Sequence, residues 1–309
     1  MIYPSKITKE PNQNFKSESK IKNIFEKIKV AAQNVIYMKN LNDNLPDKQQ
    51  KYEMRNITYK IPEIYSDNQY DLKLIDKKSN LLKSAQKLRY TSFFGKKLFA
   101  YKLDSDIYDK FSQHLIVVDN NKSKNKVIGT YRLLDEAMMP PNFDFYTSSE
   151  FDISKLKKNS SNILEVGRSC VDERYRDGRI IKLLWRGLAT EIIKRDIDLV
   201  IGCASFPTTI PNKIIEELSY LKHFHSPPKE YNTVPIDSKA VNYPIIRKEK
   251  LNFKKIFKHL PPLIKAYIRT GAWFGRGAVI DSDFKTIDVC VILKTQNIKN
   301  KYLDLAKKG

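Results

Sequence analysis

Apolar and polar positions along the chain follow two periods, and their order predicts a domain built from strands and helices. Short apolar runs typical of strands lie at 70–76, 114–119, 127–134, 199–206 and 277–293, and another begins at 163. Apolar residues recur at helical spacing in 79–94, 178–194 and 212–224. The polar stretch between the second and third strands predicts a hairpin, and the fully apolar run LVIGCASF at 199–206 is typical of a strand buried on both faces. We assign this mixed α/β domain to residues 66–309.

Residues 1–65 have a different pattern and are expected to form a basic, partly helical N-terminal extension. Between 16 and 38, apolar residues recur at helical spacing and lysines occupy the other faces. A helix of this kind can lie on a membrane surface or pack on the core of its own protein. The polar piece at 40–51 is expected to be a loop or linker.

The formal net charge of +21 favours a partner of opposite sign. Nucleic acid, an anionic membrane surface and an acidic protein would each fit, although part of the excess can reflect the base composition of a genome. No recognised nucleic-acid-binding motif is present, so we expect no nucleic-acid partner. The 3 cysteines are far apart, which argues against a disulfide framework, and no apolar run approaches the length of a membrane span. These features predict a cytoplasmic protein.

The stretch ILEVGRSCVDERYRDGRIIKLLWRGLA at 163–189 carries charges within a strand and at the corner where a helix follows. In a regular strand Glu165 and Arg168 point to opposite faces. A β-bulge at Gly167 would bring both to one face and leave backbone groups free for an extended substrate. The alternative is a Glu–Arg pair that only stabilises the fold, because buried charges usually pair.

The corner after this strand is rich in arginine. Arg174, Arg176 and Arg179 surround the predicted helix start at Gly178, where free backbone N–H groups and the helix dipole attract anions. These residues predict a phosphate site. A solvated loop, in which the neighbouring acidic residues only pair with the arginines, is the alternative.

Several long segments resemble the L-ornithine N-alpha-acyltransferases of ornithine-lipid biosynthesis, a branch of the GNAT acyltransferase superfamily. They are EVGRSCVDERYRD, LLWRGLA and LVIGCASF within 165–206, AQKLRYTSFF at 85–94, DIYDKFSQHLIVVD at 106–119, VIGTYRLL at 127–134 and the segment 261–293. The likeness covers roughly residues 80 to 293, and several segments in register are more specific than one short motif. It implies an α/β (α+β) GNAT-like fold, with a mixed, mostly antiparallel sheet, helices on both faces and a splayed central strand pair.

The resemblance implies transfer of a 3-hydroxyacyl chain from acyl carrier protein to the α-amine of L-ornithine, giving lyso-ornithine lipid. The donor would enter on its phosphopantetheine arm, with no other cofactor and no metal, and the enzyme would be cytoplasmic or peripheral on an anionic membrane. A transferase for another amine and a non-catalytic basic membrane-binding protein are the alternatives.

A more distant likeness to N-acyl-homoserine-lactone synthases implies which residues form the site. The matching positions are Arg89, Phe93, Asp106, Asp109, Arg132, Glu165 and Arg168. Glu165 and Arg168 are the expected catalytic pair, with Glu165 as the base or as the group that orients the amine. The other five are expected to bind substrate, and Arg89 and Arg132 would hold the acceptor carboxylate.

Some positions depart from the family pattern or have simpler explanations. The loop at 175–180 retains one glycine of the usual GNAT phosphate loop, which fits a carrier-protein donor with a single phosphodiester better than acetyl-CoA. Cys170 is expected to be a small core residue rather than a nucleophile. His223 and His225 suit a loop better than a metal site. The aromatic and basic segment 253–275 is either a membrane contact or a helix packed on the sheet.

Overall fold

A computed structural model of the chain describes residues 65–66, 69–95, 102–121 and 126–298. The predicted N-terminal extension, apart from Tyr65, lies outside these residues, so its helix and its boundary stay predictions. Within the described residues the helices are α3 (Leu82–Phe94), α4 (Ser154–Asn159), α5 (Arg179–Lys194), α6 (Ile215–Phe224), α7 (Phe253–His259) and α8 (Pro262–Thr270).

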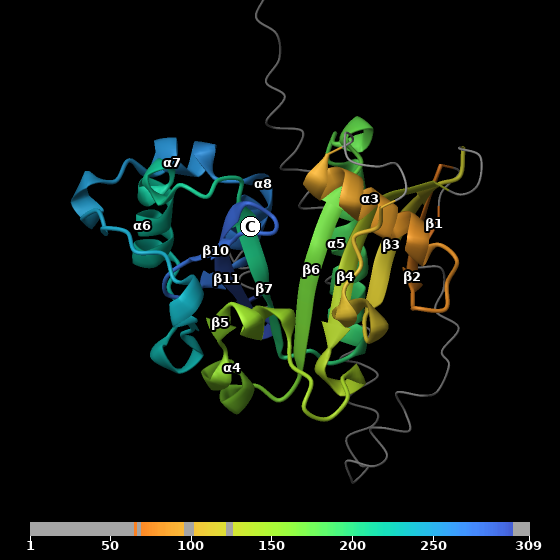
Figure 1. The fold of residues 1–309 in the computed structure, drawn as a ribbon, viewed down its shortest axis with the longest axis horizontal. Helices are drawn as coiled ribbons and strands as arrows, with labels where there is room; N and C mark the ends of the chain where they lie inside the picture. The colour runs from red at the N-terminus through yellow and green to blue at the C-terminus, as the bar shows by residue number, and fades with distance from the viewer. Residues whose placement is uncertain (1–64, 67–68, 96–101, 122–125, 299–309) are drawn as a thin grey trace, which may run out of the picture. The chain divides into compact units, whose positions relative to one another are not determined.

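One large sheet organises the described residues (Figure 1). Its order is β1 (Tyr65–Ser66), β2 (Tyr70–Ile75), β3 (Gln113–Asp119), β4 (Lys126–Asp135), β6 (Ile163–Val171), β7 (Leu199–Phe206), β11 (Thr286–Lys294) and β10 (Val279–Asp281), and β9 (Trp273–Phe274) also pairs with β11. β6 and β7 are parallel, whereas the other pairs are antiparallel. The short strands β5 (Phe151–Asp152) and β8 (Val234–Pro235) form a separate pair. The predicted mixed, mostly antiparallel sheet is confirmed.

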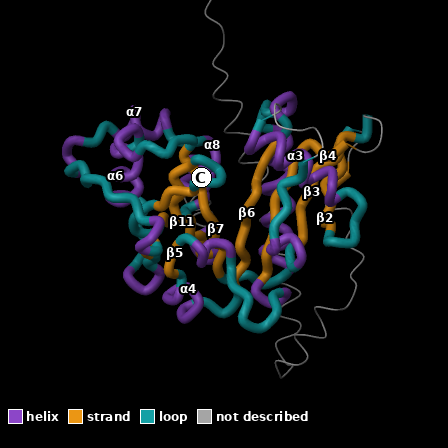
Figure 2. The backbone as a smooth tube through the Cα atoms, viewed as in Figure 1, coloured by secondary structure: helices purple, strands orange, loops and turns teal. Residues whose placement is uncertain are grey.

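Helices cover both faces of the sheet, as expected (Figure 2). Leu115 and Val117 of β3 point toward α5 and pack in one core with its apolar stripe. Ile116 and Val118, which alternate with them, point the other way and pack with Ala85 of α3. The larger core therefore lies under α5, and the face under α3 is left with less apolar packing and with room for polar groups.

The central strands β6 and β7 separate after a short parallel ladder. Their pairing runs from Ile163 opposite Leu199 to Glu165 opposite Ile201, after which the two strands diverge (Figure 1). At the point of divergence a Cβ on Gly202 would lie 2.3 Å from the carbonyl oxygen of Val166, so only glycine lets the two backbones come this close. The predicted splayed central pair is confirmed, and Glu165 lies where the splay begins.

Two predicted helical segments have different bounds in the structure. The predicted helix at 212–224 begins at Ile215, because Pro211 starts a separate 3₁₀ turn. The segment 253–275 forms two helices divided at Pro261 and Pro262, and its buried residues Ile256, Ile264 and Tyr267 pack on the core. Within the part of the chain that the structure describes, no helix is long and apolar enough to cross a membrane.

Candidate active site

A β-bulge in β6 turns Arg168 toward the α3 face. Thr130 of β4 lies opposite Cys170, yet Arg132 lies opposite Gly167, so β6 has one residue more than its partner over this interval. Arg168 itself has a φ of +52°, in the left-handed region that residues other than glycine rarely occupy. The predicted bulge is confirmed, one residue later than Gly167, and it places Arg168 on the same face as Glu165 and Arg132.

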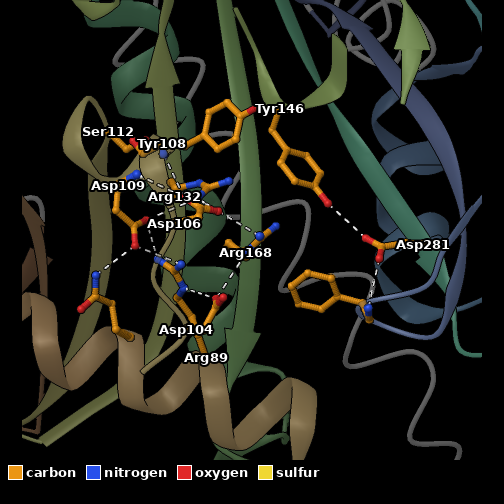
Figure 3. Close-up of polar contacts among 12 residues, drawn as sticks. Arg89, Asp104, Asp106, Tyr108, Asp109, Ser112, Arg132, Tyr146, Arg168 and Asp281 are labelled. Carbon is orange, nitrogen blue, oxygen red and sulfur yellow. Dashed lines mark hydrogen bonds and ion pairs between the residues drawn. The ribbon is translucent and has the colours of Figure 1, made fainter. Parts of the chain in front are cut away.

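Three arginines and three aspartates form a network on this face, which we call the arginine–aspartate network (Figure 3). It consists of Arg89, Arg132, Arg168, Asp104, Asp106 and Asp109. Arg89 of α3 donates to Asp104 at 2.7 Å and to Asp109 at 2.9 Å. Arg132 donates to Asp106 at 2.6 Å, and Arg168 donates to the other oxygen of Asp106 at 2.9 Å. The positive and negative charges are equal in number, so the network is balanced internally.

The network has a buried base and a more open edge. The side chain of Arg89 is 0% exposed and that of Arg132 is 2% exposed, whereas those of Arg168 and Asp106 are 11% and 24% exposed. Burial opposes ionisation of Asp109, but the neighbouring Arg89 outweighs it and holds the pKa of this carboxyl at about 2. Arg89 and Arg132 are thus already paired with aspartates. Their predicted contact with an acceptor carboxylate stays a prediction, and Arg168 is the arginine nearest to solvent.

Aromatic rings enclose Arg168 from the far side of the splay. Its guanidinium lies 4.8 Å from the ring centroid of Tyr146 and 4.6 Å from that of Phe284. Phe284, in the turn between β10 and β11, contacts the predicted site residue Phe93 at 5.5 Å between centroids. Phe93 therefore packs on the ring that lies against Arg168, and its predicted contact with substrate stays a prediction.

Glu165 lies beside the network without an ion pair to it. Its side chain is 3% exposed and accepts a hydrogen bond of 2.8 Å from the backbone N–H of Thr147. Burial raises the pKa of Glu165, while that hydrogen bond and the charges of Arg132 and Arg168 act in the opposite direction. Since Arg168 pairs with Asp104 and Asp106, the alternative of a purely structural Glu165–Arg168 pair is not what the structure shows.

A second group of carboxylates lies on the other side of the splay. Glu150, Asp281 and Asp288 have carboxylate oxygens within 4.8 Å of one another, a grouping that can hold a cation. We call these three residues the acidic cluster. Glu150 follows the 3₁₀ turn η3 (Tyr146–Ser149), and Asp281 and Asp288 come from β10 and β11. Tyr146 joins the two groups, because its ring lies against Arg168 and its hydroxyl donates to Asp281 at 3.0 Å (Figure 3).

The arginine-rich corner lies between β6 and α5, as the sequence predicts. Gly178 precedes α5 with a φ of +91°, and Arg174 and Arg179 are 64% and 60% exposed. Each arginine has a local partner: Arg174 pairs with Asp172 at 2.7 Å, Arg179 with Asp177 at 2.7 Å, and Arg176 donates to the carbonyl of Val171 at 3.0 Å. The pairing expected for a solvated loop is present, and the exposed guanidiniums remain accessible to an anion.

The cysteines and histidines fit the simpler explanations. Burial raises the pKa of Cys170 and of Cys290 to about 12 and that of Cys203 well above its usual range, so all three thiols stay protonated at neutral pH. His223 contacts the carbonyl oxygen of Ile246, and His225 the hydroxyl of Tyr220. His223 is the one correction, since it lies in the last turn of α6 and not in a loop.

Several residues of the site were not found from the sequence. They are Asp104, Tyr146, Glu150, Asp281 and Asp288. The first three lie in loops or 3₁₀ turns, where no periodicity tells an inward side chain from an outward one. Asp288 could have been found, because it interrupts the apolar strand 286–294 at a position that faces the core.

The chain is similar in sequence to known acyltransferases. Residues 88–186 match the model of the acetyltransferase (GNAT) domain. The L-ornithine N(alpha)-acyltransferase of Agrobacterium fabrum is 37% identical over 232 residues, 71% of this chain and 79% of that protein. That of Rhizobium meliloti is 36% identical over 208 residues, 66% of this chain and 70% of that protein. Among solved structures, the AHL synthase LasI has a TM-score of 0.38 and 12% identity, covering 73% of this chain and 89% of LasI.

Proposed function

Because the chain belongs to the L-ornithine N(alpha)-acyltransferase family, we propose that it joins an acyl chain to the α-amine of L-ornithine through an amide bond. The structural observation that supports this is the bulge at Arg168, which gathers Glu165 and the arginine–aspartate network at the start of the β6–β7 splay. There the diverging strands leave backbone groups unpaired, next to charged side chains that can orient an amino acid.

The reaction requires a neutral amine, an aligned thioester and support for the negative oxygen that develops. The α-nitrogen attacks the thioester carbonyl carbon and forms the C–N bond. As the tetrahedral intermediate collapses, the C–S bond breaks and the thiol leaves with a proton. Glu165 is our candidate for the group that takes the proton from the amine, because burial raises its pKa toward the working range. Unpaired N–H groups of the diverging strands are our candidates for the oxyanion donors.

The donor we propose is 3-hydroxyacyl-acyl carrier protein. Its phosphopantetheine arm carries one phosphodiester, and Arg174, Arg176 and Arg179 at the β6–α5 corner offer guanidinium donors of the kind that bind a phosphate. The net charge of +21 favours an acidic protein as donor. The product would be a lyso-ornithine lipid. Because its acyl chain is apolar, an enzyme located at the membrane surface could release it directly into the bilayer.

The test is a reconstituted assay with purified protein. We expect release of carrier-protein thiol and formation of acyl-ornithine, followed by mass spectrometry, when 3-hydroxyacyl-carrier protein and L-ornithine are supplied. Glu165→Gln should lower kcat by about 100-fold or more, the usual contribution of a general base. Glu249→Gln, an exposed glutamate in the turn before α7, is the matched control and should leave kcat unchanged.

Other outcomes separate the parts of the proposal. Turnover of another amine but not of ornithine would refute the acceptor and keep the reaction class. Equal rates with acyl-coenzyme A would refute the preference for a carrier protein. A Glu165→Gln variant with full activity would remove Glu165 from the chemistry.

A further inference from the structure

The acidic cluster, unlike the arginine–aspartate network, has no positively charged side chains from the described ranges paired with its carboxylates. The arginine–aspartate network pairs each carboxylate with a guanidinium. Among the described residues, by contrast, no Lys or Arg forms an ion pair with Glu150, Asp281 or Asp288. Three carboxylates within 4.8 Å of one another and without a cation are costly to bury. The arrangement is that of a site for a positively charged ligand.

One oxygen of the cluster is unused. Glu150 is 1% exposed, and its Oε2 atom has no hydrogen-bond partner in the described part of the chain. Asp281 accepts from the hydroxyl of Tyr146, and Asp288 accepts from the hydroxyl of Thr286 at 2.7 Å. These partners are neutral hydroxyls and bring no positive charge to the cluster. Besides the nearby Cys203 thiol, which favours ionised Glu150, this buried oxygen offers an acceptor position to a donor group of a bound ligand.

The cluster is joined directly to the proposed reaction site. Thr147 donates its backbone N–H to Glu165 and accepts at its carbonyl oxygen from the backbone N–H of Glu150 at 3.1 Å. Its neighbour Tyr146 contacts Arg168 on one side and Asp281 on the other. The turn η3 therefore links the cluster to Glu165 through the two backbone hydrogen bonds of Thr147.

We propose that the acidic cluster binds the side-chain ammonium group of the acceptor, the δ-ammonium of L-ornithine, and thereby selects a diamino acid. This inference rests on the proposed function. An ammonium group has three N–H donors, which matches three converging carboxylates. The three methylene groups of ornithine would place its α-amine near Glu165, while the charged δ-amine stays protonated and cannot react.

The raised pKa values in the cluster predict that binding of a cation depends on pH. Burial and the nearby Asp288 raise the pKa of Glu150 to about 7, and burial raises the pKa of Asp288 to about 6. The charged and titratable groups that act on these two are Asp281, Arg168, Lys239 and Cys203. A bound ammonium would stabilise the ionised carboxylates, so the affinity for ornithine should fall as the pH drops below about 7.

The first experiment uses the wild-type protein and two acceptors that differ only at the δ-position. L-norvaline has the carbon skeleton of ornithine without the δ-amine. We expect kcat/KM for ornithine to exceed that for norvaline by about 100-fold or more, since a site built for a charged group rejects an analogue that lacks it. Calorimetry without donor should detect binding of ornithine and not of norvaline at the same concentration.

The second experiment removes one charge from the cluster. In Glu150→Gln and Asp288→Asn, we expect the ornithine-to-norvaline ratio of kcat/KM to fall about 30-fold or more, through the KM for ornithine, while values for norvaline stay unchanged. Asp283→Asn is the matched control, because this exposed aspartate lies in the same turn as Asp281 but outside the cluster. The control should keep the wild-type ratio.

Three results would overturn the inference. They are a wild-type enzyme that acylates ornithine and norvaline equally well, variants that lose both acceptors in parallel, and activity that requires a divalent cation and is abolished by EDTA. A wild-type enzyme with no turnover of ornithine would instead refute the proposed function, so the two failures are distinguishable.

Discussion

At the residue scale, His114 is a neutral imidazole buried beneath charged side chains. Its side chain is 0% exposed, and its Nε2 atom lies 3.9 Å from the carboxylate of Asp109. Neither ring nitrogen has a hydrogen-bond partner among the described residues. Burial lowers its pKa to about 4, although Asp109 acts in the opposite direction and Arg89 and Arg132 add to the lowering. The folded protein therefore keeps His114 neutral at pH values where the unfolded chain protonates it.

This difference predicts that acid destabilises the fold through His114. The unfolded histidine takes up a proton near its ordinary pKa of 6.5, but the folded one does so only near 4. Stability from the neutral ring is present above pH 6.5 and is lost as the pH falls toward 4. Between pH 7 and pH 5 the loss should be about 2 kcal/mol. Urea unfolding at both pH values measures it.

The comparison variants for this measurement are His114→Leu and His259→Leu. His114→Leu should lose that part of the pH dependence, whereas His259→Leu, at an exposed position in α7, should retain the wild-type difference. If the free energy of unfolding depended on pH equally in wild type and His114→Leu, protonation of His114 would not be the cause of the acid destabilisation.

Some residues of the site could be predicted from the sequence, whereas others could not. Glu165 and Arg168 were found because a charge within an apolar strand breaks a periodic pattern. Glu150 and Tyr146 were not found, because they lie in a segment without periodicity, next to a strand of two residues. Their importance comes from contacts with β6 and β10, which are distant in sequence.

At the scale of elements, the β6–α5 unit depends on two backbone irregularities. The bulge at Arg168 could be predicted, because only an extra residue brings Glu165 and Arg168 to one face. Its position was displaced by one residue, since sequence favoured glycine for the unusual backbone and the structure uses arginine. The second irregularity is the left-handed conformation of Gly178, which directs the chain into α5.

Replacement of Gly178 by alanine should therefore destabilise the protein by about 1 kcal/mol, the cost of a left-handed conformation for a residue with a Cβ. Steric contact adds nothing, because a Cβ at Gly178 would meet no atom within 4 Å. Gly167→Ala is the control, since it also has open space but no positive φ, and it should change stability little. Thermal unfolding measures both. Equal destabilisation would contradict the role of backbone conformation.

At the scale of the whole molecule, resemblance to a family predicted more than periodicity could. The periodic pattern located most strands and helices, but it could not order them in the sheet, because pairing between distant strands leaves no local trace. The mixed sheet and its splayed central pair were implied by the GNAT-like fold, whereas the order, in which β7 lies between β6 and β11, comes from the structure. Net charge is also a property of the whole chain, and its value of +21 bears on how a donor protein would dock.

We predict that docking of an acidic carrier protein is driven by charge and depends on the β6–α5 corner. The KM for acyl-carrier protein should rise with ionic strength, because salt screens exposed charges over about 10 Å at 0.1 M. The KM for an acyl-pantetheine donor, which lacks the protein, should change little. Replacing Arg174, Arg176 and Arg179 together by alanine should raise the carrier-protein KM about tenfold and reduce its salt dependence, since rim charges act mainly on association.

The control for this arginine variant removes positive charges from a different part of the surface. Lys155 and Lys158 are exposed on α4, which follows β5 and is separate in sequence from the corner. Alanine at these two positions should leave the carrier-protein KM and its salt dependence near the wild-type values. If the lysine variant weakened the donor as much as the arginine variant, the effect would belong to the net charge of +21 and not to the corner. A long-range field of the whole molecule would then guide the donor without a defined docking surface.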